Sequence, residues 1–214
     1  MKDPDRAFAG DGDLQRPKPT DGAADGDLWF QERLPSPLYH PPIFFSFPTP
    51  VSRDQFEMVK SIYRILSRNR LTPRTLGVNE YDFKEPLKAI RRLLNQSHGL
   101  LALAFRKTTV DRGSTIRRRG DDAPKHEELS GLGLTSPWVQ IETAMAYQID
   151  IPIMVLREQD VNDDGLLQDG VVVHHMPVFS FDNGTSTFFK GREFNAALKQ
   201  FVQAVNDKAF GGDH

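Results

Sequence analysis

The fold is decided by the stretch Gly99-Leu100-Leu101-Ala102-Leu103-Ala104-Phe105, which carries no polar side chain. A parallel strand covered by helices needs apolar side chains on both faces, so this run indicates a buried strand. The pattern recurs in Ile151-Pro152-Ile153-Met154-Val155-Leu156, and a third apolar run, Ile43-Phe44-Phe45-Ser46-Phe47, is closed by Pro48. The three runs predict the central strands of a sheet that is buried on both faces.

Amphipathic segments separate these runs. The first begins with Ser52-Arg53-Asp54-Gln55, a capping box in which the serine hydroxyl accepts a hydrogen bond from the amide three residues on. Helices are predicted over residues 52–70, residues 85–96, about twelve residues from Trp138, and residues 191–209. Edge strands are expected at Val171–Val173 and Pro177–Phe181. This alternation predicts an α/β fold, a flavodoxin-like open parallel sheet of about five strands flanked by helices.

Two segments do not follow the alternation. Residues 1–40 are rich in Gly, Pro, Asp and Ala and hold few aliphatic side chains, so they cannot bury enough surface to offset their ordering entropy, and we expect a flexible N-terminal tail. Residues 106–135 show no clear period and follow a central strand, at whose carboxyl end open α/β sheets bind ligands. We therefore expect a single α/β domain over residues 41–210, with 106–135 as an insertion loop near the site.

The composition excludes several classes of function. The 214 residues include no cysteine, which rules out a disulfide scaffold, a cysteine zinc site and a thiol nucleophile. The formal charge of −2 argues against bulk binding of nucleic acid or of an anionic membrane surface. No apolar run approaches the roughly 18 residues of a membrane span, and the N-terminus leads into no apolar signal region. We expect a cytoplasmic protein that binds a small molecule, not nucleic acid or a membrane.

One carboxylate, Glu142, lies on or beside the apolar face of the helix from Trp138. Helical spacing predicts an inward stripe made of Trp138, Ile141, Met145 and Ile149. Partial burial would raise the pKa of Glu142 toward neutrality, where a carboxylate can act as a nucleophile or general base. The alternative is a structural carboxylate that pairs with one of the arginines of the chain.

The order of the motifs resembles that of two known families. Ser46-Phe47 ends the first strand, and Ser136-Pro137-Trp138 is followed by Glu142 four residues after the tryptophan; this order resembles the TIR domains. Glu142 and Ala146 also fit the E-x-x-x-A pattern of the nucleoside 2-deoxyribosyltransferases and related nucleotide N-glycosidases. The resemblance covers roughly residues 43–160. Both families combine a flavodoxin-like sheet with cleavage of an N-glycosidic bond, so it implies an N-glycosidase or ribosyltransferase acting on NAD or a related nucleoside or nucleotide.

The resemblance also implies roles for individual residues. Glu142 would be catalytic, as the nucleophile of the transferases or as the group that stabilises an oxocarbenium-like centre in the NAD-cleaving TIR enzymes. Ser46 and Phe47 would contact the substrate and Trp138 would stack on a base, although aromatic side chains at such positions more often belong to the core. Two residues are candidates for the acid that protonates the leaving base in the transferases: Asp82 and Asp111.

If that acid is absent, NAD is the favoured substrate, because nicotinamide leaves as a neutral molecule. No cofactor is expected, since NAD or the nucleotide would be the substrate, and we expect a homo-oligomer. A different class stays open, a catalytically silent nucleotide-sensing or TIR-like interaction module. A third alternative is a structural domain in which Glu142 only forms an ion pair.

Other motifs predict no metal site. The first six positions of an EF-hand loop are matched by Asp160-Val161-Asn162-Asp163-Asp164-Gly165, but Val171 stands where the bidentate glutamate is required. His174 and His175 are adjacent, so on a strand they would point to opposite faces. A run of three basic residues, Arg117-Arg118-Arg119, could bind substrate phosphates. The acidic residues nearby favour instead a charged segment that faces solvent.

Overall fold

A computed structural model of the chain describes residues 39–78, 85–117, 123–173, 175–182 and 184–211. The tail predicted over residues 1–40 therefore lies outside the described residues, apart from Tyr39 and His40.

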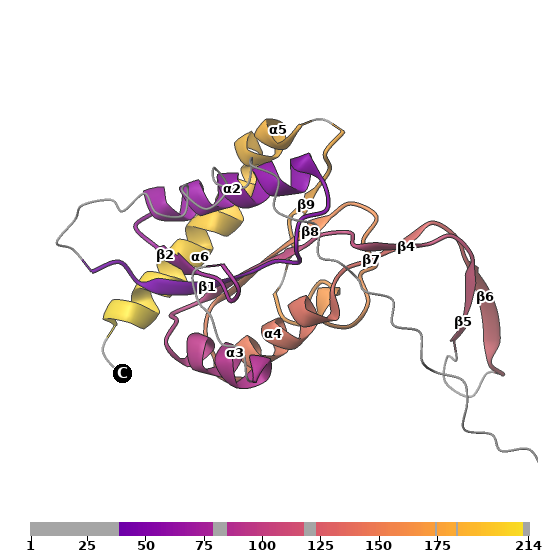
Figure 1. Cartoon of the computed structure of the whole chain (residues 1–214), viewed down its shortest axis with the longest axis horizontal. Coiled ribbons are helices and arrows are strands. Elements are labelled where there is room, and N and C mark those ends of the chain that lie inside the picture. Colours follow the sequence, from indigo (N-terminus) through magenta and orange to yellow (C-terminus); the bar gives the residue numbers. More distant parts are fainter. Residues whose placement is uncertain (1–38, 79–84, 118–122, 174, 183, 212–214) are drawn as a thin grey trace, which may run out of the picture. The chain divides into compact units, whose positions relative to one another are not determined.

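A five-stranded parallel sheet forms the centre of the fold (Figure 1). Its strands are, in spatial order, β2 (Thr72–Arg74), β1 (Pro42–Ser46), β3 (Leu100–Ala104), β8 (Ile153–Glu158) and β9 (Val178–Phe179). Every neighbouring pair is parallel. Counted along the chain within this sheet, the order is 2-1-3-4-5, which is the flavodoxin-like order. The predicted fold class is confirmed.

Two details of the sheet differ from the prediction. Strand β2 has no strand signature in the sequence because Pro73 cannot donate to a ladder, and it is tolerated here because β2 lies at the edge of the sheet. Val171–Val173, expected as an edge strand, is a turn instead. Gly170 adopts a φ of 82°, and its N–H donates to the carbonyl of Val173 at 2.8 Å.

Helices cover both faces of the sheet (Figure 1). One face carries α2 (Arg53–Arg68) and α6 (Arg192–Phe210), and the other carries α3 (Pro86–Asn95) and α4 (Pro137–Gln148). Two short elements lie between β8 and α6, the 3-10 turn η2 (Gly165–Leu167) and α5 (Thr185–Lys190). The predicted cap of α2 is confirmed, since Ser52 Oγ accepts a hydrogen bond from the N–H of Gln55 at 3.2 Å.

Side-chain alternation along β1 divides the core into two layers. Phe44 is buried in the layer that β1 and β3 form with α3 and α4, together with Ile90 and Val139. Alternation sends the buried Ile43 and Phe45 to the opposite face. Burying each such side chain contributes about 1.5–3 kcal/mol, which fixes the faces of β1. The next residue on the Phe44 face is Ser46, which therefore points toward the layer that contains α4.

Residues 106–135 are not the irregular loop that was expected, because they pair as two antiparallel ribbons. The paired strands are β4 (Thr108–Val110) with β7 (Leu132–Leu134), and β5 (Gly113–Arg117) with β6 (Lys125–Leu129). Most of β5 and β6 is exposed, so this ribbon has no buried face and no apolar alternation to reveal it in the sequence. Near β7, the N–H of Gly133 donates to the carbonyl of Asp160 at 3.1 Å, and the N–H of Asn162 donates to the carbonyl of Gly133 at 2.8 Å.

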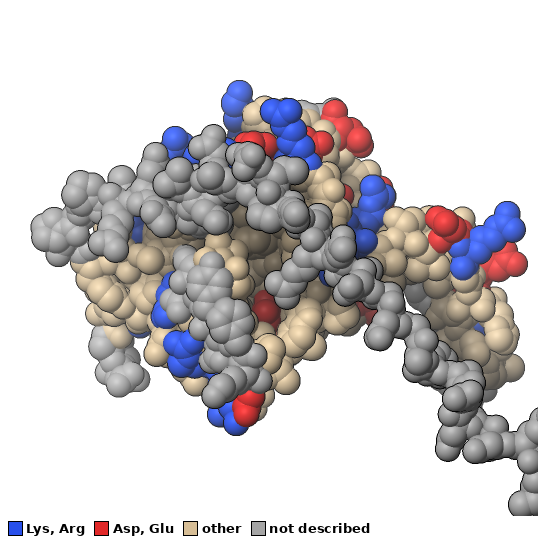
Figure 2. All heavy atoms as spheres, viewed as in Figure 1, with Lys and Arg blue, Asp and Glu red and all other residues tan. Residues whose placement is uncertain are grey.

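Basic and acidic side chains are interspersed on the face drawn in Figure 2. This mixture reflects a chain with 27 basic and 29 acidic residues. In the described ranges, no helix has both the length and the apolar character needed to cross a membrane.

Candidate active site

A cleft opens beyond the carboxyl ends of β1 and β3, where the strand order reverses. Strand β1 has β2 on one side and β3 on the other, so the connections that leave β1 and β3 diverge and leave a crevice for a ligand. Its volume is about 340 Å³, which is in the range of small-molecule pockets. The described residues that line it are Ser46, Phe47, Pro48, Thr49, Leu76, Pro86, Ile90, Lys107, Ser136, Trp138, Val139 and Glu142.

Helix α4 brings Glu142 to this cleft. The helix is capped by Ser136, whose Oγ accepts a hydrogen bond from the N–H of Trp138 at 3.4 Å. The buried residues of α4 are Val139, Glu142, Thr143 and Ala146. The predicted inward stripe is wrong for Trp138 and Ile141, which are 46% and 39% exposed, whereas Met145 and Ile149 are partly buried and pack against the core. Small side chains form the true packing face, since Ala102 and Ala104 of β3 belong to the same core cluster as Val139 and Ala146 of α4.

Glu142 is a buried carboxyl group with a single hydrogen-bond donor among the described residues. It is 9% exposed, and Ser46 Oγ donates a hydrogen bond to its Oε2. Burial raises the pKa of Glu142 from 4.5 to about 7, and the hydrogen bond from Ser46 opposes part of that rise. In the part of the chain that the structure describes, no lysine or arginine forms an ion pair with Glu142. The arrangement therefore differs from the salt-bridged carboxylate that was the structural alternative.

Two aromatic residues predicted to bind substrate also line the cleft. Trp138 is about half exposed, which distinguishes it from a core aromatic residue. The ring of Phe47 packs against that of Phe45, with the centroids 4.8 Å apart, so Phe47 contributes both to the core and to the cleft wall. An exposed indole beside a buried carboxyl group can stack on a planar base while the carboxylate faces the attached sugar.

Of the two predicted leaving-group acids, Asp111 lies outside the cleft and Asp82 is not among the described residues. Asp111 is exposed in the turn between β4 and β5 and is not among the described lining residues. Asp82 lies outside the described residues, as do Arg118 and Arg119 of the candidate phosphate-binding run. Lys107 lines the cleft and is missed by the sequence reasoning. Its position just after the predicted strand that ends at Phe105 was the available signal, because ligand-binding residues follow the carboxyl ends of such strands.

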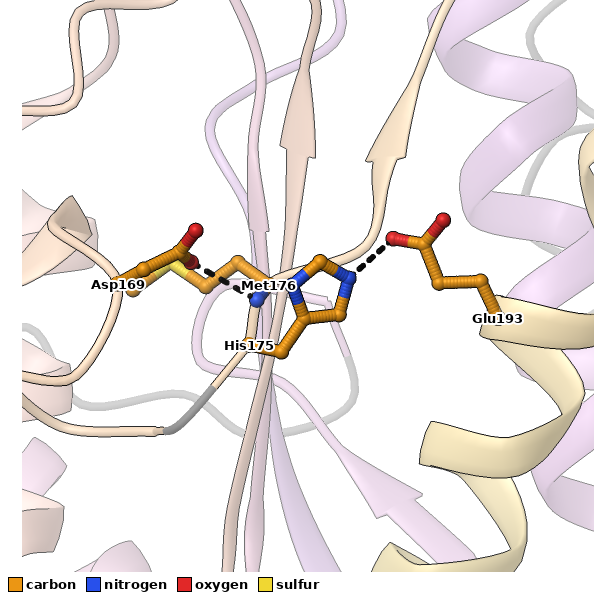
Figure 3. A network of polar contacts seen from close by, with 4 residues as sticks. All are labelled: Asp169, His175, Met176 and Glu193. Atoms are coloured by element: carbon orange, nitrogen blue, oxygen red, sulfur yellow. Dashed lines mark hydrogen bonds and ion pairs between the residues drawn. The ribbon is translucent and has the colours of Figure 1, made fainter.

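A separate polar network lies before β9 (Figure 3). His175 Nε2 contacts Glu193 Oε1 in the first turn of α6, and the N–H of Met176 donates to Asp169 Oδ1 at 3.1 Å. His174 is outside the described residues. In the segment that resembles an EF-hand loop, the carboxylate of Asp164 caps η2, accepting a backbone N–H at 2.8 Å. Within the described ranges, no group of three or more His, Asp or Glu residues could hold a metal ion.

Similarity to known proteins is found at the level of structure. No protein-family model and no curated protein matches the sequence. Among solved structures, the chain is similar to the CMP N-glycosidase BcmB of Clostridium botulinum, with 11% sequence identity and a TM-score of 0.40. The match covers 70% of this chain and 96% of that one. The resemblance to TIR domains and deoxyribosyltransferases stays a prediction from the motifs.

Proposed function

We propose that this chain cleaves the N-glycosidic bond of NAD or of a related nucleoside or nucleotide, with Glu142 acting at the anomeric carbon. The observation that carries the proposal is the buried Glu142 carboxyl group, held by Ser46 at the switch point of the sheet, in a cleft that Trp138 also lines. A carboxylate in such a site meets the developing positive charge of an oxocarbenium-like sugar, and the low local dielectric strengthens that interaction.

The reaction breaks the bond between the anomeric carbon and the base, and the electron pair leaves on the base. Glu142 either attacks the anomeric carbon to form a ribosyl ester or stabilises the oxocarbenium-like centre electrostatically. Water then adds its oxygen to the same carbon and releases a proton. Where an ester has formed, its bond to Glu142 breaks and the carboxylate is regenerated, and the product is the ribosyl part of the substrate with a hydroxyl group at the anomeric carbon. Because burial raises the pKa of Glu142 to about 7, the required carboxylate forms as the pH rises through neutrality.

The described residues of the cleft suit a base that leaves without being protonated. Glu142 is the one carboxyl group among the described lining residues, and it cannot donate a proton to the base while it acts as an anion at the sugar. Nicotinamide leaves NAD as a neutral molecule and needs no acid. NAD, or another nucleotide with a cationic base, therefore needs only the carboxyl group that the described lining residues supply, whereas a nucleoside whose base must be protonated needs a second acid.

The proposal is tested by incubating the purified protein with NAD and measuring the release of nicotinamide. Glu142→Gln keeps the shape of the side chain and removes the charge, so release should fall by at least about 100-fold, the low end of what a single electrostatic catalytic group contributes. Asp111→Asn is the matched control, because it makes the same chemical change at an exposed position outside the cleft. Release that persists in the Glu142 variant would contradict the proposal.

The same experiment separates an enzyme from a silent nucleotide-sensing module. A module would bind the nucleotide and gain stability, about 2.7 kcal/mol when the ligand is a hundredfold above its Kd, without releasing a base. Binding without release by the unmodified protein would therefore replace the proposed activity by nucleotide sensing.

A further inference from the structure

Lys107 is the one basic side chain among the described residues that line the cleft. It forms no ion pair with any other described residue, so its charge is available to a ligand. The cleft also contains the carboxyl group of Glu142. An anionic group on a ligand would be repelled by the ionised form of Glu142 unless a cation compensates, and Lys107 can supply that cation.

The backbone around Lys107 is held by hydrogen bonds on both sides. The N–H of Lys107 donates to the carbonyl of Leu134 at 2.8 Å. The N–H of Arg106 donates to Glu158 Oε2 at 2.8 Å, and the side-chain amide of Gln55 donates to the carbonyl of Arg106 at 3.2 Å. The segment that leaves β3 is therefore fixed where it reaches the cleft.

The groups that hold this segment are buried. Glu158 is 7% exposed and Gln55 is 4% exposed, and the Gln55 amide donates to Glu158 Oε2 at 3.1 Å. Gln55 Oε1 accepts the N–H of Val51 at 2.9 Å, so the network also reaches the segment that follows β1. Among the described residues, Glu158 has no cationic partner. A carboxylate buried without a cation costs free energy, and here it is satisfied by donors that fix the backbone.

We propose that Lys107 determines specificity by binding a phosphate group of the substrate, and that Glu158 and Gln55 are positioning residues that hold Lys107 at the cleft. The substrate is then a nucleotide, with a monophosphate or a pyrophosphate, and a free nucleoside binds weakly. The inference rests on the proposed function for the sugar and the base, but the binding of phosphate is tested separately. An ammonium group is a compact charge that suits phosphate oxygens.

The test uses ligand pairs that differ only in phosphate: nicotinamide riboside with nicotinamide mononucleotide, and adenosine with AMP. Kd is measured by calorimetry on the Glu142→Gln protein, which prevents turnover, and NAD is added to compare a pyrophosphate with a monophosphate. In this background the phosphorylated member should bind more tightly. Lys107→Met should weaken its binding by about 10- to 100-fold and leave the nucleoside within about twofold, as expected for one hydrogen bond to a charged group. Lys107→Arg should retain most of the preference.

Equal binding within each pair, or an equal loss for both members in Lys107→Met, would overturn the inference. If the unmodified protein releases base from nucleoside and nucleotide alike, the proposed function stands and the phosphate site is wrong. If phosphate-dependent binding is lost in Lys107→Met but no base is ever released, the phosphate site stands and the proposed activity is wrong.

Glu158→Gln tests the positioning role. The variant should weaken the binding of the nucleotide and leave the binding of the nucleoside unchanged. If Glu158 had a merely structural role, the binding of both ligands would weaken equally. Gln55→Ala is a second variant, because it leaves the bond between Glu158 and the Arg106 N–H in place. Glu193→Gln, at an exposed position on α6, is the control and should leave the phosphate preference unchanged.

Discussion

Replacing Glu142 by glutamine should make the fold more stable, and increasingly so as the pH rises. In the folded chain, burial raises the pKa of Glu142 from its ordinary value of 4.5 to about 7. The folded state thus favours the protonated carboxyl group, whose contribution to stability is fully present below pH 4.5 and is lost as the pH rises through about 7. At 1.36 kcal/mol for each pH unit, the loss amounts to about 3 kcal/mol. Glutamine is neutral at every pH and can still accept the hydrogen bond from Ser46, so the variant escapes this loss.

The assay is urea unfolding of both proteins at several pH values between about 4 and about 8. The difference in unfolding free energy should grow by about 3 kcal/mol over that range, which corresponds to a Tm difference of roughly 6–12 °C for a domain of this size. Asp111→Asn, an exposed control, should stay within about 0.5 kcal/mol of the unmodified protein at each pH. A difference between the Glu142 variant and the unmodified protein that does not change with pH would refute the reasoning.

Three further predictions concern Ser46, Trp138 and Gly133. Ser46→Ala removes the hydrogen bond that lowers the pKa of Glu142. The acid limb of the pH profile for base release should therefore move up by about one to two pH units. An unchanged acid limb would show that Ser46 does not set the pKa of Glu142. Trp138→Ala should raise KM about tenfold by removing a stacking surface, with little change in Tm because the side chain is 46% exposed; a large fall in Tm would assign Trp138 to the core. In Gly133→Ala the new Cβ would lie 2.5 Å from the carbonyl oxygen of Asp160, so urea unfolding should show a loss of about 1–3 kcal/mol, and no loss would mean that the backbone there moves freely.

The central strands could be predicted because burial on both faces requires a continuous run of apolar residues, which is visible in the sequence. The apolar runs that contain β1, β3 and β8 need no knowledge of their neighbours to be read as buried strands. Strand β2 left no such record, since it is three residues long, contains Pro73 and lies at an edge. The ribbon β5–β6 left none either, because backbone pairing alone holds it and its side chains are mostly exposed.

The site was predicted in part, for reasons that lie in α4. Glu142, Ser46 and Trp138 do line one cleft, but helical spacing also placed Trp138 and Ile141 inside, where they are not found. A close approach between a helix and a strand needs small side chains, so Ala146 faces the sheet, whereas Trp138 is 46% exposed and lines the cleft. Hydrophobic periodicity identifies the apolar residues of a helix, but it does not indicate how much space separates the helix from the sheet. Lys107 was not predicted to line the cleft, because a surface lysine belongs to no sequence pattern. Its position in the cleft follows only from the path of the chain after β3.

The two buried glutamates show why burial alone does not identify a catalytic carboxylate. Glu158 accepts hydrogen bonds from the Gln55 amide and from the N–H of Arg106, and it does not line the cleft. The Gln55 amide and the Arg106 N–H occupy its Oε2, and losing these hydrogen bonds would disrupt the segment that follows β3. Glu142 has one described donor, the hydroxyl of Ser46, and it faces a cavity of about 340 Å³. A carboxyl group that is desolvated yet only partly satisfied gains most when a cationic centre enters the cavity, so the proposed chemistry rests on Glu142 and the proposed positioning of Lys107 on Glu158.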